Sequence, residues 1–232
     1  MKPILLSVLL AHVLACPVLA DDADVTGPFT WTGAHIGVQA GYAWGKSTGG
    51  AYFPPATIPP FIGDIDPEGF IGGVSAGYNL QFDNPFVIGI EGDFNFASVD
   101  GDSSLVLTGI PSPFDEASGD LKWTASIRAR AGYAIDRFLP YVTAGIAFGK
   151  YEFTPDYPTF GLGPQPDSKV HVGPTAGAGV EYAITDHLTT RLEYRYTNFG
   201  NATYAIPGFC GCIESRVDLK THDIKIGLQY KF

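Results

Sequence analysis

The sequence predicts an all-β protein, on the basis of its composition and the spacing of its apolar residues. The 232 residues include 29 Gly, 12 Tyr and 16 Phe, and only 16% are charged. Apolar residues alternate with polar or small ones over many stretches, which is the spacing of a strand with two different faces. A helical bundle would contain less Gly and a disordered chain fewer aromatics, so neither class fits.

The amino-terminal residues are typical of an export signal rather than of the fold. Lys2 precedes an apolar run over residues 4–14, and a stretch of small or apolar residues ends at Ala20. We therefore expect residues 1–20 to be a cleaved signal peptide and residues 21–30 to form a short periplasmic segment. The later sequence has no apolar run of about 18 residues that could form a transmembrane helix.

The first four alternating stretches lie at residues 33–44, 70–81, 88–96 and 123–133. One face of each is apolar, and in chain order these faces carry Ile36, Val38, Tyr42, Val74, Tyr78, Ile88, Ile90, Phe94, Trp123, Ile127 and Tyr133. The opposite faces are polar or small and carry His35, Gln39, Ser75, Asn79, Glu91, Asp93, Arg128 and Arg130. A strand between lipid and a lumen has this pattern.

The second four stretches lie at residues 142–149, 176–184, 188–197 and 223–232. Their apolar faces carry Val142, Ile146, Phe148, Val180, Tyr182, Leu192, Tyr194, Tyr196, Ile224, Leu228 and Tyr230. Their other faces carry Thr143, Glu181, Arg191, Glu193, Arg195, Asp223 and Lys225. The stretch at 142–149 is the least distinct, because its polar face is nearly all small.

The connections between the stretches alternate in length, with short turns at 83–85, 136–139 and 185–187 and long segments at 46–68, 99–119, 153–171 and 200–218. Short turns on one side and long loops on the other are typical of bacterial outer-membrane barrels. We predict an eight-stranded antiparallel up-and-down transmembrane β-barrel over residues 31–232, with the four long segments as surface loops. A soluble sandwich or lipocalin-like barrel also alternates, but its apolar face points inward, and the charges on the polar face here disfavour that arrangement.

Aromatic residues recur at the ends of the expected strands. Tyr78, Tyr133, Tyr182 and Tyr230 face outward near the short turns, and Trp44, Trp123 and Tyr196 face outward near the long segments. Rings in the acyl layer with polar tips at the headgroups form the aromatic girdles of a transmembrane barrel. These seven residues are therefore the predicted girdles.

The predicted lumen contains equal numbers of acids and bases, namely Glu91, Asp93, Glu181, Glu193, Asp223, Arg128, Arg130, Arg191, Arg195 and Lys225. One interpretation is an ion path or binding site. The other is a plug of mutually neutralised charges. Eight strands leave a lumen just wide enough for side chains, and buried charges are costly unless they are paired, so the plug is favoured.

Several segments resemble a known family. The carboxyl end from Lys225 through Gly227 and Tyr230 to Phe232 is similar to the assembly signal of outer-membrane barrels, and residues 31–42 resemble the first strand of the porin-like surface-antigen barrels of alphaproteobacteria. Residues 128–133, 139–143 and 192–196 continue the likeness. The resemblance implies an eight-stranded barrel in the outer membrane of a Gram-negative bacterium. It also implies that outer-membrane lipid, lipopolysaccharide and, during biogenesis, the barrel-assembly machinery are its partners.

Other candidate sites are sparse. Cys210 and Cys212 could form a small loop disulfide in an oxidising compartment, which we favour over a metal site because no His lies nearby. The histidines lie outside any nucleophile motif, so we expect no enzyme activity, no catalytic or metal residues and no cofactor. The formal charge of −10 without a basic cluster argues against nucleic-acid binding.

The sequence therefore favours a structural surface barrel with a charge-plugged lumen. Two alternatives remain open. One is a narrow porin for ions or very small solutes. The other is a receptor or adhesin that binds a host or small-molecule ligand at its loops, such as haemin, which some members of the resembled family are reported to bind.

Overall fold

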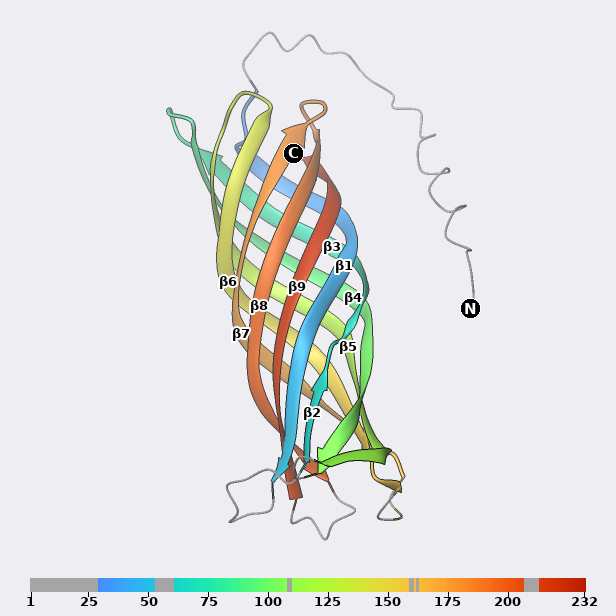
Figure 1. Ribbon diagram of the computed structural model, residues 1–232. Helices are drawn as coiled ribbons and strands as arrows, with labels where there is room; N and C mark the ends of the chain where they lie inside the picture. The colour runs from blue at the N-terminus through green and yellow to red at the C-terminus, as the bar shows by residue number, and fades with distance from the viewer. Residues whose placement is uncertain (1–28, 53–60, 108–109, 159–160, 162, 207–212) are drawn as a thin grey trace, which may run out of the picture.

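Eight long antiparallel strands form a closed ring in the computed structural model of the protein (Figure 1). The structure describes residues 29–52, 61–107, 110–158, 161, 163–206 and 213–232. The strands are β1 (Gly33–Tyr52), β3 (Glu68–Gln81), β4 (Phe86–Leu107), β5 (Ile110–Tyr133), β6 (Phe138–Asp156), β7 (Asp167–Ala183), β8 (Leu188–Ile206) and β9 (Ile213–Lys231). Each strand pairs with its neighbour in sequence, and the predicted eight-stranded barrel is confirmed.

A short ninth strand, β2 (Phe61–Ile65), lies between β1 and β4 at the end opposite the chain's carboxyl terminus (Figure 1). It pairs with residues 47–51 of β1 and with Val106 and Leu107 of β4. It therefore continues β3 outward after a break at residues 66–67, and takes the place of β3 between β1 and β4 at this end of the ring.

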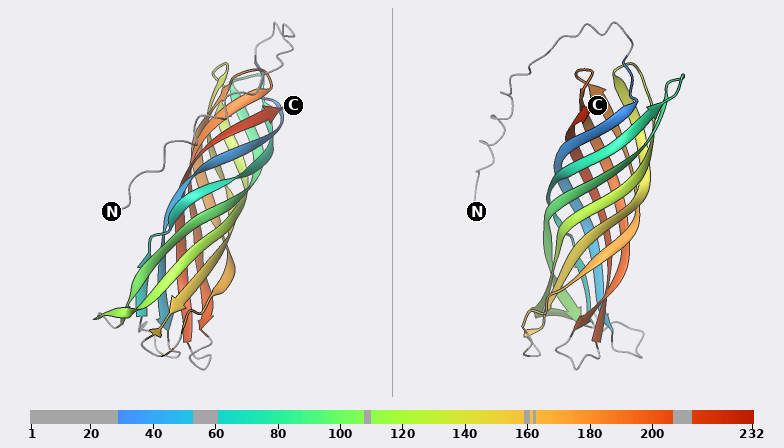
Figure 2. Two further views of the ribbon diagram at one scale, coloured as in Figure 1. Left: turned by 90° about the vertical axis from the view of Figure 1, so that its right-hand side faces the viewer. Right: turned by 180° about the vertical axis from the view of Figure 1, so that it is seen from behind.

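The ring closes where β9 pairs with β1, from His35 opposite Lys231 to Tyr52 opposite Glu214. The last backbone bond of this seam runs from the Phe232 amide to the Ala34 carbonyl, at 2.9 Å. Closure matters because a free strand edge in lipid would leave backbone groups without hydrogen-bond partners, at a cost of several kcal/mol each. Figure 2 shows the strands tilted steeply around the barrel axis.

The strands continue well into the segments that the sequence analysis assigned to loops. β4 and β5 pair from Phe86 opposite Tyr133 out to Leu107 opposite Ile110, and so occupy most of 99–119. The other three ranges, 46–68, 153–171 and 200–218, also contain strand residues at both ends. The loop prediction was therefore too long in the described residues, because pairing satisfies the backbone and encloses a second core beyond the membrane. No helix in the described part of the chain is long and apolar enough to cross a membrane.

The two faces of the central strands differ as the period of two predicts. Outward side chains are apolar and exposed, including Val38 at 62% and Phe96 at 71%. The inward positions of the same strands are buried and polar, for example Gln39 and Asn95. A surface that is apolar all round and a polar interior suit a barrel surrounded by lipid.

Candidate functional site

The lumen of the barrel holds the ten charged residues that the sequence placed there, which we call the ionic network. All ten are buried. At its centre the Glu91 carboxylate lies 2.6 Å from Arg128 and 2.5 Å from Arg191. Arg130 lies farther from the same carboxylate, at 3.8 Å. One glutamate from β4 thus joins arginines of β5 and β8, on distant parts of the ring.

A second group of charges lies toward the outer end of the network. The Asp93 carboxylate lies 3.1 Å from the Arg195 guanidinium and 3.2 Å from the Arg128 guanidinium. Arg195 also contacts Asp223, at 3.0 Å, and Lys225 lies 2.6 Å from the same Asp223 carboxylate. Each of these four side chains contacts at least two opposite charges, since Lys225 also lies 3.8 Å from Glu193. The arrangement is therefore a network rather than a set of separate pairs.

The remaining two acids tie β7 and β8 into the network. Glu193 accepts hydrogen bonds from Arg128, at 2.7 Å, and from the Tyr141 hydroxyl, at 3.0 Å. Glu181 lies 2.9 Å from Arg130, whose guanidinium also covers the Tyr141 ring at 4.1 Å. The structure therefore brings all ten predicted charges together and gives each at least one opposite partner.

Neutral polar residues complete the network, and the sequence analysis did not single them out as site residues. Gln39 accepts a hydrogen bond from Arg191 and donates one to Asn95. Asn95 and Ser126 in turn donate to Asp93. The alternation of each strand places all three side chains on its inward face, so the sequence could have predicted them. The predicted site, however, included only the charged residues.

Between the ionic network and the outer end of the barrel, the end opposite the carboxyl terminus, the lumen becomes apolar. Aromatic and aliphatic side chains from the outer ends of the strands fill it, and we call this cluster the outer apolar core. Its buried members are Ala43, Ile65, Ile71, Val99, Ala117, Leu121, Ala147, Tyr151, Phe153, Tyr157, Phe199, Tyr204, Val217 and Leu219. The sequence analysis missed it because it treated half of these residues as loop residues and did not consider the others as one cluster.

Two β-bulges help to build the outer apolar core. On β5 the register shifts between Leu121 and Trp123, so that Leu121 points inward although Trp123, two residues away, points outward. On β8 it shifts between Asn198 and Asn201, around Gly200, whose φ of 64° suits glycine. An extra residue reverses which side chains face inward, so each bulge changes the parity of its strand.

A buried polar chain crosses the outer apolar core. The Nε2 atom of His171 lies 2.8 Å from the Tyr204 hydroxyl, which donates to the Tyr151 carbonyl at 3.2 Å. Burial raises the pKa of the Tyr151 hydroxyl to about 12. Tyr151 lies beyond the outer girdle, because its partner Leu121 comes before Trp123 on a strand that runs inward from the outer end.

The opposite mouth of the barrel is closed by Trp31, which is only 1% exposed. Its amide donates to the Gln81 side chain at 2.8 Å and its indole to the Asp136 carbonyl at 3.1 Å. The ring packs with Val87, Leu139 and Ala183. The sequence analysis placed Trp31 at the start of the barrel but gave it no role.

The predicted girdle residues all face outward. The four tyrosines near the short turns are about half exposed: Tyr78, Tyr133, Tyr182 and Tyr230. At the other girdle, His222 stacks on Trp44, with ring centroids 5.8 Å apart, and packs on Tyr196 at 5.0 Å. Trp123 stacks on Phe94 at 5.8 Å. The two girdles mark the two edges of the band that faces lipid.

Charged residues follow immediately beyond the outer girdle. Lys46 lies two residues beyond Trp44 on β1, and its ammonium is 2.8 Å from Asp64. Lys150 is the strand partner of Trp123. The outward faces therefore change from aromatic to charged within two residues, which is the boundary between lipid and water.

The remaining predicted sites are easily located. Of the predicted assembly signal, Lys225, Gly227 and Tyr230 lie near the end of β9 in the closing seam with β1. Phe232 directly follows β9, and its amide donates to the Ala34 carbonyl of β1. Cys210 and Cys212 lie outside the described residues. Within the described ranges, no group of three or more His, Cys, Asp or Glu side chains is arranged to hold a metal ion.

A closed antiparallel barrel with an apolar outer belt, aromatic girdles and a charged lumen defines a bacterial outer-membrane β-barrel protein. Comparison of sequences agrees with this class. The chain belongs to the family described as "Outer membrane protein beta-barrel domain", which matches residues 6–232.

Named relatives extend this result. The chain is 36% identical to the "31 kDa outer-membrane immunogenic protein" of Brucella melitensis, over 97% of this chain and 94% of the relative. It is 33% identical to the "25 kDa outer-membrane immunogenic protein" of Brucella abortus, over 93% and 86%, and 31% identical to the "22 kDa outer membrane protein" of Rhizobium leguminosarum, over 92% and 83%. The protein is thus an outer-membrane protein of a Gram-negative bacterium.

Two solved structures are similar in fold. OprG from Pseudomonas aeruginosa matches with a TM-score of 0.58 and 14% identity, over 90% of this chain and 99% of that one. The outer membrane protease OmpT from Escherichia coli matches with a TM-score of 0.51 and 13% identity, over the same shares. At these identities the likeness concerns the fold alone.

Proposed function

We propose that this protein is a structural, non-conducting surface barrel of the outer membrane. The observation that carries the proposal is that two different sets of side chains, the ionic network and the outer apolar core, fill successive parts of the lumen. The ionic network occupies the middle of the barrel within the membrane, and the outer apolar core fills the lumen from near the level of the outer girdle outward. An ion would have to pass both.

The energetics support a closed lumen. Buried charges remain stable only while they are paired and hydrogen-bonded, so a conducting path through the ionic network would have to replace several contacts at once. The outer apolar core adds a barrier of another kind, because an ion that enters it loses its hydration without gaining a partner. Trp31 closes the periplasmic mouth as well.

A role at the cell surface is supported by the relatives, whose names describe them as immunogenic outer-membrane proteins. An immunogen must present residues outside the cell, and the outer ends of the strands and their connections would do so here. We propose no catalytic activity. A receptor or adhesin function at the connections stays a second possibility for the same surface.

Planar-bilayer conductance tests the proposal. The intact, refolded protein should show no steady conductance. Arg191→Ala combined with Phe153→Ala should produce openings more often than either change alone, because each removes part of one filling. Arg137→Ala is the matched control, since Arg137 pairs with Asp186 at the periplasmic turns, at 2.7 Å and partly in solvent. Large, stable, ion-selective channels in the intact protein would overturn the proposal in favour of a narrow porin.

We further propose that the end of β9 is read by the barrel-assembly machinery. The support is its position, because Phe232 completes the seam that closes the ring. Deletion of Phe232 should reduce membrane insertion in cells more than deletion of five residues within 207–212, between the end of β8 and the start of β9. Equal insertion of the two variants would refute this role.

A further inference from the structure

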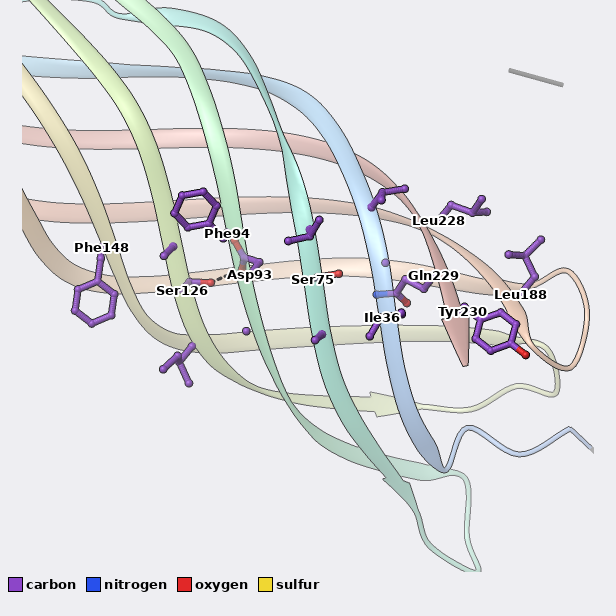
Figure 3. Close-up of a pocket in the computed structure, with 17 residues that line it drawn as sticks. Ile36, Ser75, Asp93, Phe94, Ser126, Phe148, Leu188, Leu228, Gln229 and Tyr230 are labelled. Atoms are coloured by element: carbon purple, nitrogen blue, oxygen red, sulfur yellow. Dashed lines mark hydrogen bonds between the residues drawn. The ribbon is translucent and has the colours of Figure 1, made fainter. Parts of the chain in front are cut away.

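An apolar groove of about 890 Å³ runs across the lipid-facing surface of the barrel (Figure 3). It crosses from Leu188 and Tyr230, near the periplasmic turns, to Phe94 and Phe148, nearer the outer girdle. Two adjacent rows of outward side chains form its walls, and they follow the strand pairing from β9 through β1, β3, β4 and β5 to β6. The groove is therefore an oblique channel on the outside of the barrel.

Small residues make the groove hollow. Gly92, Ala76 and Ala125 occupy outward positions where the surrounding surface carries larger side chains such as Ile127 and Val74. At Gly92 an added Cβ would meet its nearest neighbour, a backbone oxygen, only at 3.6 Å. The absence of a side chain there is not required by packing within the protein, so the space is available to something outside it.

The outer end of the groove leads directly to a lysine. Phe148, which lines that end, lies two residues before Lys150 on the same face of β6. Phe94 lines it from the other side and stacks on Trp123, the strand partner of Lys150. A molecule in the groove would therefore pass Trp123 and reach the Lys150 ammonium at the membrane boundary.

Lys150 differs from the other outward lysines at this level. Lys46 and Lys220 each have a carboxylate partner, at 2.8 and 3.1 Å. Lys122, beside Lys150, is shared between Asp120 at 3.3 Å and Glu152 at 3.5 Å. Lys150 has no carboxylate within 4.0 Å among the residues that the structure describes.

We propose that the groove and Lys150 together form a binding site for a phosphate-bearing, acylated glycolipid of the outer leaflet. One acyl chain lies in the groove over Gly92 and Ala125, the glycolipid's carbohydrate rests near Trp123, and a phosphate contacts Lys150. The acids Asp120 and Glu152 lie farther from the membrane and are held by Lys122, so they leave the Lys150 ammonium available. The site rests on the proposed orientation, with the outer apolar core outside the cell.

The headgroup half of the site is tested with lipid A as the probe. Detergent-refolded protein is titrated with diphosphorylated lipid A and with its dephosphorylated form, and bound lipid is counted by native mass spectrometry. Lys150→Gln should weaken binding of the phosphorylated form about fivefold, the equivalent of about 1 kcal/mol, because one lysine near an anionic surface contributes that much. It should leave the dephosphorylated form unchanged. Lys46→Gln is the matched control and should change neither, since Asp64 already holds that ammonium.

The acyl half is tested by filling the groove. Gly92→Leu should weaken binding of both lipid A forms, because the leucine occupies the space of the chain. Ala129→Leu is the control, since Ala129 also faces lipid but does not line the groove. Both variants place an apolar residue in lipid, and heat-modifiable migration on gels verifies that each has folded.

Equal binding by Lys150→Gln and the intact protein would overturn the assignment of the phosphate, and equal binding by Gly92→Leu would overturn that of the groove. A similar loss in Lys46→Gln would show general attraction to the charged rim instead of a site. These results are independent of conductance. A barrel that conducts but binds lipid A as described would disprove only the proposed function.

Discussion

The two halves of the lumen are both filled with side chains, but one half is charged and the other is apolar. In the membrane the interior is charged, and Arg128 alone contacts Glu91, Asp93 and Glu193. Beyond the outer girdle the interior is apolar, and residues such as Leu219 and Tyr151 are fully buried. The outward faces show the reverse order, apolar in the first half and charged in the second.

The difference shows that the solvent outside decides what the barrel holds inside. Where lipid surrounds the strands, their outward positions must be apolar, and the alternate positions receive the polar residues. Where water surrounds them, the ordinary arrangement of a soluble protein returns, with a hydrophobic interior stabilised by burial. Bulges on β5 and β8 allow one continuous strand to serve both environments.

The largest expected effect comes from breaking the ionic network on one side. Arg128→Ala leaves three carboxylates short of a partner, and breaking a buried pair in this way typically costs about 3–5 kcal/mol. Water that enters the lumen would relieve part of this, so we expect about 3 kcal/mol in urea unfolding in detergent. Arg137→Ala, which breaks a pair partly exposed to solvent, should cost under about 1 kcal/mol. If the two variants unfold at the same urea concentration, the network does not stabilise the barrel.

A cavity in the outer apolar core should cost nearly as much but act locally. Leu219→Ala removes a fully buried side chain, a change that costs about 2–5 kcal/mol. Hydrogen exchange should rise in the outer ends of β8 and β9 while the membrane halves stay protected. Leu228→Ala, at a lipid-exposed position of β9, is the control and should change neither region. Exchange that rises along the whole of β9 would mean that the two halves unfold as one unit.

Alkaline pH should distinguish the halves through Tyr151. Its ordinary pKa of 10.0 is raised to about 12 by burial in the outer apolar core. The unfolded chain releases this proton at lower pH than the folded one, so the stability of the core is full below pH 10 and falls as pH rises toward 12. The ultraviolet absorbance of tyrosinate, followed with hydrogen exchange, measures it. Tyr151→Phe should flatten this part of the pH dependence, and an unchanged profile would contradict the assignment.

The smallest expected effect concerns the buried polar chain. Tyr204→Phe removes the hydroxyl that bridges His171 and the Tyr151 carbonyl while keeping the ring in place. We expect a loss of about 1–3 kcal/mol, because it leaves buried polar groups of the outer apolar core without their partner. Tyr196→Phe at the outer girdle provides the comparison and should have a smaller effect on unfolding. A larger loss from Tyr196→Phe would place the important hydroxyl at the membrane surface.

The sequence alone determined the number of main strands, their faces and the charged composition of the lumen. A period of two is a local property of a strand, so Glu91 and Arg128 could be placed inside without knowing the partner of either. The seven girdle residues followed from the same parity. The sequence alone predicts these features because lipid requires an apolar outward face on each strand separately.

Only the tertiary structure decided which charges meet and where the interior changes character. Arg191 reaches Glu91 across the barrel from β8 to β4, and closure of the ring with its strand tilt sets that contact. At Leu121 and Gly200 the side chains that face inward change along the strand, because each bulge inserts an extra residue against a neighbouring strand. The sequence of a single strand does not show where such a bulge lies. The groove over Gly92 likewise arises from seven strands placed side by side, from β8 round to β6. Such features depend on residues far apart in the chain, which is why the alternation of one strand predicts its faces but not its partners.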